Sequence, residues 1–132
     1  MIQLERKYHF YAAHRNPEAG EKCGRIHGHT YKVICTFEFK QQANGITMLF
    51  EDVDKIVEPI IKDFDHWFLV YRYDPLYSIL LNNNEKFYCT EFKTSAENLA
   101  IYLFDEIKYK KKLPIIKLQL METESSNIII TI

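Results

Sequence analysis

Residues 27–40 read HGHTYKVICTFEFK and alternate with a period of two along their whole length. Apolar and aromatic side chains fill the odd positions from Tyr31 to Phe39, whereas most even positions are polar. This pattern is typical of a β-strand with one face in a core, because successive side chains point to opposite faces of a sheet. His27 and His29 occupy odd positions, so both imidazoles are expected on the apolar face.

Residues 2–14 show the same alternation and predict a second strand. Its apolar positions are interrupted by Arg6 and continue to His14. The segment 15–26 between the two strands is polar and contains one proline and two glycines, which is typical of a loop. If the two strands pair as a hairpin, His14 shares a face with the two histidines of the second strand.

The middle of the chain has helical periodicity in two places. After a turn at residues 43–45, apolar residues in 50–64 recur at helical spacing. Residues 65–94 are irregular and predict a long connection without regular structure. Ser95 is a suitable N-cap for a second helix over 96–110.

Two short strands end the chain, the first over 116–122 and the second after a turn at 125–127. The predicted order is therefore ββααββ, with a four-stranded sheet and two helices in a single domain, 1–132. This is an α+β fold. Edge strands of so apolar a sheet need a partner, which favours an oligomer.

Charge and composition exclude several classes of protein. The net charge of −1 gives no global basic field for nucleic acid or an anionic membrane. No stretch approaches the roughly 20 apolar residues of a membrane span, and the first residues, MIQLERKYHF, do not resemble a signal peptide. Three cysteines without regular spacing indicate reduced thiols, so a cytoplasmic location is expected.

The three histidines His14, His27 and His29 are candidate metal ligands. Three neutral imidazoles suit Zn²⁺, and three protein ligands leave one coordination position open, as in catalytic zinc sites. The alternative is that each histidine is a core residue satisfied by hydrogen bonds. Two histidines on one strand face and a third on the neighbouring strand favour the metal site.

Cys23 lies just before the second strand, close in sequence to Lys22 and Arg25. Nearby cations lower the pKa of a thiol, and a thiolate can act as a base or nucleophile. A fourth zinc ligand and an ordinary loop cysteine are the alternatives. Cys35 and Cys89 have no such neighbourhood and are predicted to be packing residues.

Two acidic positions also stand out. Asp65 precedes His66 directly after the first helix, and a carboxylate beside an imidazole can fix its tautomer, although such pairs also occur by chance. Glu122 continues the apolar parity of its strand, so it is expected to point inward or to lie at the mouth of a pocket. The alternative for Glu122 is a strand end already in solvent.

Five motifs together resemble a known family. HFYAAH, CGRIHGHTY, DFDH, SAENLA and MET occur in the order and approximate spacing of the 6-pyruvoyl-tetrahydropterin synthase family, over nearly the whole chain. The three residues between the cysteine and the first paired histidine resemble the bacterial 6-carboxy-tetrahydropterin synthases. The resemblance implies the tunnelling fold (T-fold), with a four-stranded antiparallel sheet and two helices. It also implies trimers that stack into hexamers, with active sites at subunit interfaces.

The resemblance also implies roles for the metal-binding and basic residues. His14, His27 and His29 match the family's zinc ligands, and Cys23 matches a catalytic cysteine that acts as a general base. Zn²⁺ is therefore the expected cofactor.

Further roles follow from the same resemblance. Asp65 and His66 match a catalytic relay pair. Glu122 matches the carboxylate that holds the pterin ring, and Thr123 follows it as in the family. Leu49 departs from the aspartate that the family often has before the first helix.

The implied activity is that of a zinc-dependent lyase of queuosine (7-deazapurine) biosynthesis. It would convert 7,8-dihydroneopterin triphosphate to 6-carboxy-5,6,7,8-tetrahydropterin, acetaldehyde and triphosphate. Two alternatives stay open. One is a 6-pyruvoyl-tetrahydropterin synthase, which eliminates triphosphate from the same substrate and keeps the carbon chain. The other is a non-enzymatic zinc-binding assembly protein in which Cys23 closes a four-ligand site.

Overall fold

The computed structural model describes residues 1–132, and two long strands form the middle of its sheet. β1 (Ile2–His14) and β2 (His27–Phe39) pair antiparallel from Ile2 opposite Phe39 to His14 opposite His27, without a break in register. Both predicted strands are confirmed, and β2 ends one residue earlier than expected. The pairing places the ends of both strands that carry histidines side by side.

The sheet has six strands in the order β4-β3-β1-β2-β5-β6. β5 (Ile115–Thr123) pairs antiparallel with β2, and β6 (Ser126–Thr131) pairs antiparallel with β5. The turn between β5 and β6 lies one residue earlier than predicted, at 124–125. All three pairings among these four strands are antiparallel.

The expectation of only four strands is wrong, because two short parallel strands extend the sheet. β3 (Trp67–Tyr71) pairs with β1 through Ala12 and Ala13 only, and β4 (Tyr88–Thr90) pairs with β3. The sheet is therefore mixed. Strands of three to five residues with few partners are too short for a period of two to be recognised in the sequence.

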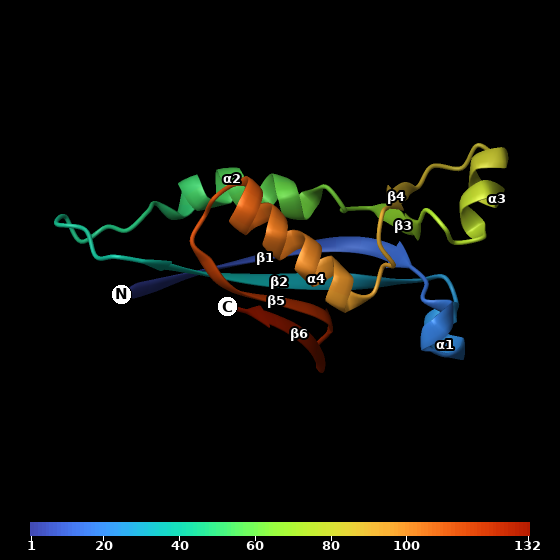
Figure 1. Ribbon diagram of the computed structural model, residues 1–132, viewed down its shortest axis with the longest axis horizontal. Helices are drawn as coiled ribbons and strands as arrows, with labels where there is room; N and C mark the ends of the chain where they lie inside the picture. Colours follow the sequence, from blue (N-terminus) through green and yellow to red (C-terminus); the bar gives the residue numbers. More distant parts are fainter.

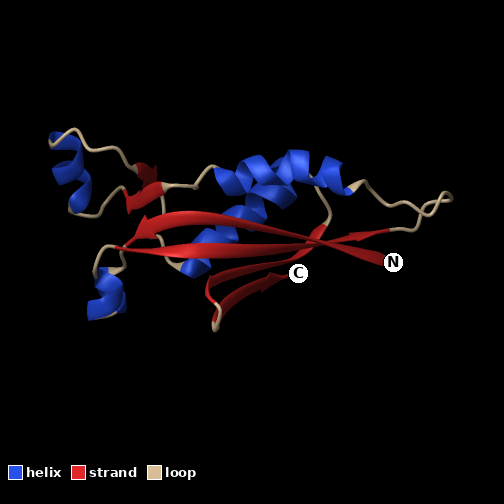
Figure 2. Ribbon diagram, turned by 180° about the vertical axis from the view of Figure 1, so that it is seen from behind, coloured by secondary structure: helices blue, strands red, loops and turns tan.

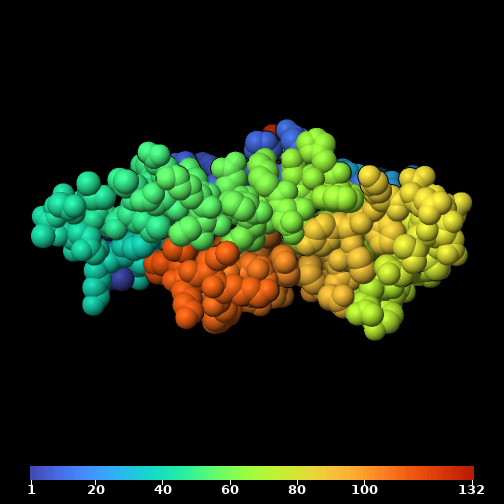
Figure 3. Space-filling view, turned by 90° about the horizontal axis from the view of Figure 1, so that it is seen from above, coloured from blue at the N-terminus to red at the C-terminus, as the bar shows by residue number.

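Helices α2 (Phe50–Lys62) and α4 (Ala96–Asp105) lie on one side of the long strands (Figure 1) and pack beside each other along the molecule (Figure 3). α4 begins at the predicted cap, where the Ser95 hydroxyl accepts a hydrogen bond from the backbone N–H of Asn98 at 3.2 Å. It continues into a π-helical turn, Glu106–Lys110. At Leu49, the residue before α2, no side chain caps the helix.

The core lies between the helices and the sheet. Its side chains come from the even positions of β1, the odd positions of β2 and the inner faces of both helices. Those fully buried from solvent include Phe10, Tyr31, Val33, Phe37, Val53, Val57, Ile61, Leu99 and Leu103. The opposite face of β1 and β2 carries no helix (Figure 2). The alternation read from the sequence therefore identifies the covered face correctly.

The prediction that residues 65–94 lack regular structure is wrong. They contain β3, the helix α3 (Leu76–Asn82) and β4. This part projects at one end of the molecule (Figure 1). A second short segment at the same end holds a 3₁₀ turn, Pro17–Ala19, and the single-turn helix α1 (Glu21–Gly24). Both segments lie beyond the ends of β1 and β2 that carry the histidines.

No helix combines the length and the apolar character that crossing a membrane would require.

Arg6, which interrupts the apolar positions of β1, has a partner on α2. Its Nε and Nη2 donate to Asp54 Oδ1 and Oδ2 at 3.0 and 2.7 Å, and the Tyr8 hydroxyl donates to Asp54 Oδ1 at 2.7 Å. These bonds, led by those from Arg6, hold the pKa of Asp54 below its usual value of 3.8. The polar residue on the covered face therefore connects β1 to α2.

We expect Asp54→Asn to lower the free energy of unfolding at pH 7 by about 1–2 kcal/mol, because Arg6 loses its ion pair at a half-exposed position. The folded-state pKa of Asp54 lies below the unfolded one, so its contribution is complete above about pH 4 and is lost as the pH falls through the folded value. Urea unfolding of both proteins at pH 7 and pH 3 should show the difference shrinking in acid.

The matched control is Asp105→Asn, which changes an exposed aspartate on α4 without an ion pair. It should leave stability nearly unchanged at both pH values. A difference between parent and Asp54→Asn that is equally large at pH 3 would contradict the ion-pair explanation.

Candidate metal centre and active site

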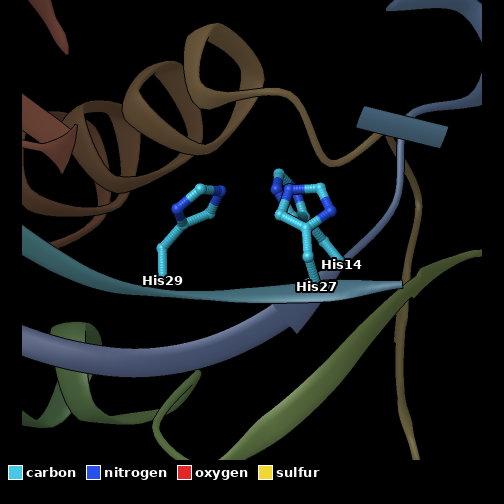
Figure 4. A group of neighbouring side chains, drawn as sticks. All are labelled: His14, His27 and His29. Carbon is cyan, nitrogen blue, oxygen red and sulfur yellow. The ribbon is translucent and has the colours of Figure 1, made fainter. Parts of the chain in front are cut away.

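Three histidines form a cluster at the adjoining ends of β1 and β2. His14 stands opposite His27 in the strand register, and His29 stands opposite Ala12. The ring centroids lie 4.7 Å apart for His14 and His27, 5.2 Å for His14 and His29, and 4.8 Å for His27 and His29. One nitrogen of each ring lies within 4.8 Å of the other two. All three rings rise from the sheet toward the side of α4 (Figure 4).

Backbone carbonyls orient two of the three rings. His14 Nδ1 lies 2.6 Å from the Thr94 carbonyl oxygen, and His27 Nδ1 lies 2.7 Å from the Arg25 carbonyl oxygen. A carbonyl oxygen only accepts, so each Nδ1 carries the hydrogen and each Nε2 presents a lone pair. Histidines that ligate metals are commonly oriented in this way by their second nitrogen.

Burial disfavours the charged form of two of the three imidazoles. Burial, the largest cause, lowers the pKa of His14 from 6.5 to about 4, and it also lowers the pKa of His29 against the opposing charge of Glu122. The Nε2 atoms of His14 and His29 are buried and have no hydrogen-bond partner within the chain. Neutral imidazoles with unpartnered, convergent lone pairs suit a divalent metal such as Zn²⁺.

Cys23 does not belong to the histidine cluster. The group of ligand atoms within 4.8 Å of one another comprises the three histidines alone. Cys23 is exposed on α1, and its carbonyl oxygen accepts a hydrogen bond from Asn16 N at 2.6 Å, which closes the loop after β1. Arg25, one of the two cations near it in sequence, pairs with Glu21 at 2.8 Å. The arrangement leaves the thiol free to react.

The other two cysteines differ from each other. Cys35 is fully buried in β2, which confirms its predicted packing role. Cys89 is exposed, so the same prediction for it is wrong. It lies in β4 at the outer edge of the sheet.

Glu122 and Cys23 line the same pocket, which has a volume of about 630 Å³. Only about 26% of the Glu122 side chain is exposed, and its Oε1 lies 3.8 Å from His14 Nε2. This distance would suit an ion pair, but the low pKa of His14 leaves the imidazole neutral, so the contact is not an ion pair. The inward position expected for Glu122 is confirmed. Thr123, in contrast, is exposed outside the pocket and contacts the Ser125 hydroxyl at 3.3 Å.

The pocket has a wall that sequence reasoning missed. Tyr71, Tyr73 and Asp74, from the segment expected to be irregular, line it together with Arg15. Arg15 Nε and Nη2 bind both carboxylate oxygens of Asp74 at 3.0 and 2.5 Å. This pair attaches the segment that contains α3 to the end of β1. No local signal in the sequence indicates it, because the partners are far apart in the chain.

Asp65 and His66 lie elsewhere. His66 N donates to the Tyr11 carbonyl oxygen at 2.6 Å, and Tyr11 N donates to Asp65 Oδ1 at 2.8 Å, so the pair runs along the edge of β1. Asp65 Oδ2 accepts from His66 Nδ1 at 2.9 Å. The Tyr11 side chain, whose ring lies 5.6 Å from that of His66, belongs to the face without helices, and His14 belongs to the covered face.

Within a single chain, the predicted site residues therefore lie in two separate places. The histidine cluster, Cys23 and Glu122 are brought together, whereas the pair Asp65 and His66 does not line their pocket. The imidazole of His66 is largely exposed, and its backbone has a φ of 64°. The backbone hydrogen bond from His66 N to the Tyr11 carbonyl oxygen holds this residue at the edge of β1, with its side chain exposed.

Comparisons with known proteins agree on one family. The family model described as 6-pyruvoyl tetrahydropterin synthase matches residues 3–131. A 6-carboxy-5,6,7,8-tetrahydropterin synthase of Haemophilus influenzae is 30% identical over 135 residues, which cover 96% of each chain. A protein of the same name from Aquifex aeolicus is 28% identical and covers 80% of this chain and 73% of its own.

Solved structures share the fold. An uncharacterised protein from Wolinella succinogenes superposes with a TM-score of 0.80 at 19% identity, covering 98% of this chain and 97% of its own. A 6-pyruvoyl tetrahydropterin synthase of Caenorhabditis elegans gives a TM-score of 0.72 at 20% identity, covering 98% and 94%. At these identities the similarity concerns the architecture alone.

We expect metal binding to need the three histidines and not Cys23. His27→Ala should lose stoichiometric zinc, because two imidazoles cannot complete the convergent set. Cys23→Ala should keep it, because the thiol stands outside the cluster. Metal analysis after dialysis against zinc measures both.

His9→Ala is the control, since His9 is an exposed histidine of β1 outside the cluster. It should bind zinc like the parent protein. Loss of zinc from Cys23→Ala would mean a closed four-ligand site and would contradict the open arrangement.

Proposed function

The chain belongs to the 6-pyruvoyl tetrahydropterin synthase family, and we propose that it is a zinc-dependent 6-carboxy-5,6,7,8-tetrahydropterin synthase. In this reaction 7,8-dihydroneopterin triphosphate and water give 6-carboxy-5,6,7,8-tetrahydropterin, acetaldehyde and triphosphate. The carboxylated pterin would then serve queuosine biosynthesis. The observation that carries the proposal is the three-histidine cluster beside a pocket lined by both a free thiol and a carboxylate.

The histidine cluster is the proposed zinc site, with His14, His27 and His29 as ligands. When bound, zinc supplies Lewis-acid chemistry, which polarises oxygen groups of a substrate and acidifies the C–H bonds beside them. The carbonyl oxygens of Thr94 and Arg25 keep two of the rings in the tautomer that ligation needs.

Cys23 and Glu122 act from the pocket wall. The Cys23 thiolate is the proposed general base, because it is exposed and lies outside the ligand set. Glu122 binds the pterin, since a carboxylate can accept two parallel hydrogen bonds from a ring N–H and the adjoining amino group. Its partly buried position strengthens these bonds relative to bulk water.

His66, oriented by Asp65, is the proposed proton donor, and we propose that it serves the pocket of a second copy of the chain. The support is its outward position on the edge of β1, away from its own pocket. β3 pairs with β1 only at Ala12 and Ala13, so most of that edge lacks a strand partner, as does the outer edge of β6. Pairing of such edges between copies gives a closed trimer or a dimer of trimers.

Two alternatives make different predictions. A 6-pyruvoyl-tetrahydropterin synthase would release triphosphate and keep all side-chain carbons on the pterin. The relatives named 6-carboxy-5,6,7,8-tetrahydropterin synthase, matched over most of the chain, favour the carboxy product. A non-enzymatic zinc-binding protein would have no use for Glu122 in a pocket beside a reactive thiol.

We expect purified zinc-loaded protein to convert 7,8-dihydroneopterin triphosphate to a carboxylated tetrahydropterin, and to release acetaldehyde and triphosphate in equal amounts. Mass spectrometry of the pterin and trapping of the aldehyde test this directly. Cys23→Ala is the matched control, and it should bind zinc without turning over. A pyruvoyl product without acetaldehyde would assign the chain to the other synthase.

The shared active site can be tested by mixing inactive variants. Cys23→Ala and His66→Ala should each lower kcat/KM by about 10²–10⁴-fold, the usual contribution of one acid–base group. Co-expressed in equal amounts, they should regain activity, because about one site in four combines an intact thiol with an intact imidazole from a neighbour.

The control replaces the second variant by the double variant Cys23→Ala/His66→Ala, which leaves every mixed site without a thiol and should restore nothing. If mixed oligomers of the two single variants stay inactive, Asp65 and His66 do not serve a neighbouring pocket.

A further inference from the structure

All the buried side-chain nitrogen and oxygen atoms that lack a hydrogen-bond partner belong to one place in the molecule. They are His14 Nε2, His29 Nε2 and the Tyr31 hydroxyl. A metal on the histidines accounts for the first two. It does not account for the phenol, which is neutral at physiological pH and serves as a hydrogen-bond donor. A buried hydroxyl without a partner costs about 1–3 kcal/mol, so this one requires an explanation.

The Tyr31 ring cannot easily turn its hydroxyl elsewhere. Its side chain is fully buried, and the ring stacks on Phe10 with centroids 4.7 Å apart and planes 10° apart. The edges of His29 and His14 meet it at 5.3 and 6.0 Å. The acceptor must therefore approach the hydroxyl, and not the reverse.

Glu122 is the acceptor that the strand register places beside Tyr31. The last regular pair of β2 with β5 joins Lys32 to Met121, and the next step of this antiparallel register sets Tyr31 beside Glu122 on the covered face. The Glu122 carboxylate accepts no hydrogen bond in the structure, and its Oε1 lies 3.8 Å from Nε2 of the neutral His14. A donor without an acceptor thus stands next to a carboxylate without a donor.

We propose that Tyr31 is a positioning residue for Glu122: its hydroxyl donates a hydrogen bond to the carboxylate and holds it in the direction of the pocket. Rotation about the flexible bonds of the glutamate side chain closes the contact, and the second oxygen stays available to a ligand. The same chain contains a comparable bond, since the Tyr8 hydroxyl donates to Asp54 at 2.7 Å.

This inference rests on the proposed function in one respect, namely that Glu122 binds a pterin. It adds that the carboxylate is oriented before the pterin arrives, so that less conformational entropy is lost on binding. Loss of the hydroxyl should then weaken ground-state binding and leave the chemical step almost unchanged.

The test is a double-mutant cycle of Tyr31→Phe with Glu122→Gln on the zinc-loaded protein, with neopterin as the probe in calorimetry. Tyr31→Phe keeps the ring and should raise the Kd for neopterin about tenfold, the usual effect of one hydrogen bond to a charged group. In the Glu122→Gln protein the same change should have an effect of less than about twofold, because the charged acceptor is already lost. In the single variant Tyr31→Phe, KM should rise in parallel with the Kd for neopterin, while kcat and zinc content stay at parent values.

Tyr8→Phe is the matched control, because it also removes a buried hydroxyl that faces a carboxylate, but on the side of α2. It should lower stability without changing neopterin affinity. Unchanged affinity in Tyr31→Phe, or effects of Tyr31→Phe and Glu122→Gln that simply add, would overturn the proposal.

A second measurement tests the contact itself without the Tyr31 variant. In protein labelled with ¹³C at the ζ carbon of tyrosine, Glu122→Gln should shift the Tyr31 resonance and leave that of Tyr8 in place. A Tyr31 resonance that does not move overturns the contact itself. If it moves while Glu122→Gln binds neopterin like the parent, the contact holds and the pterin role of Glu122 fails.

Discussion

The uninterrupted antiparallel pairing of β1 with β2 is the constraint on which the rest of the structure depends. It runs from Ile2 opposite Phe39 to His14 opposite His27, and it carries the apolar face on which α2 and α4 pack. A shift of one residue would move each side chain of a strand to the other face. The histidines would then separate and the core would lose its aromatic residues, so folding and ligand geometry rest on the same hydrogen bonds.

Burial and backbone hydrogen bonds determine the charge and orientation of the histidine cluster. Burial lowers the pKa of His14 to about 4, so the imidazole is neutral at physiological pH and its lone pair is not occupied by a proton. The Thr94 carbonyl oxygen, which precedes the α4 cap, fixes the orientation of that ring. The start of α4 and the end of β1 are thus joined through the His14 imidazole.

The division of the site between two faces has a structural consequence. Asp65 and His66 are held to the edge of β1 by backbone hydrogen bonds to Tyr11, whereas the pocket with Cys23 and Glu122 lies beyond the covered face. Within one chain, Asp65 and His66 therefore do not line the pocket that contains Cys23 and Glu122. Self-association would resolve this separation and at the same time give the free strand edges a partner.

By itself, the sequence determined the parts of the structure that a local period encodes. Alternation identified β1 and β2 and the shared face of His14, His27 and His29, helical spacing identified α2, and a capping residue identified the start of α4. Only the tertiary structure decided that residues 65–94 form β3, α3 and β4, that Arg15 binds Asp74, and that His66 faces away from Cys23. A period specifies which side chains share a face. Which distant segments become neighbours depends on packing and on hydrogen bonds between residues that no local pattern connects.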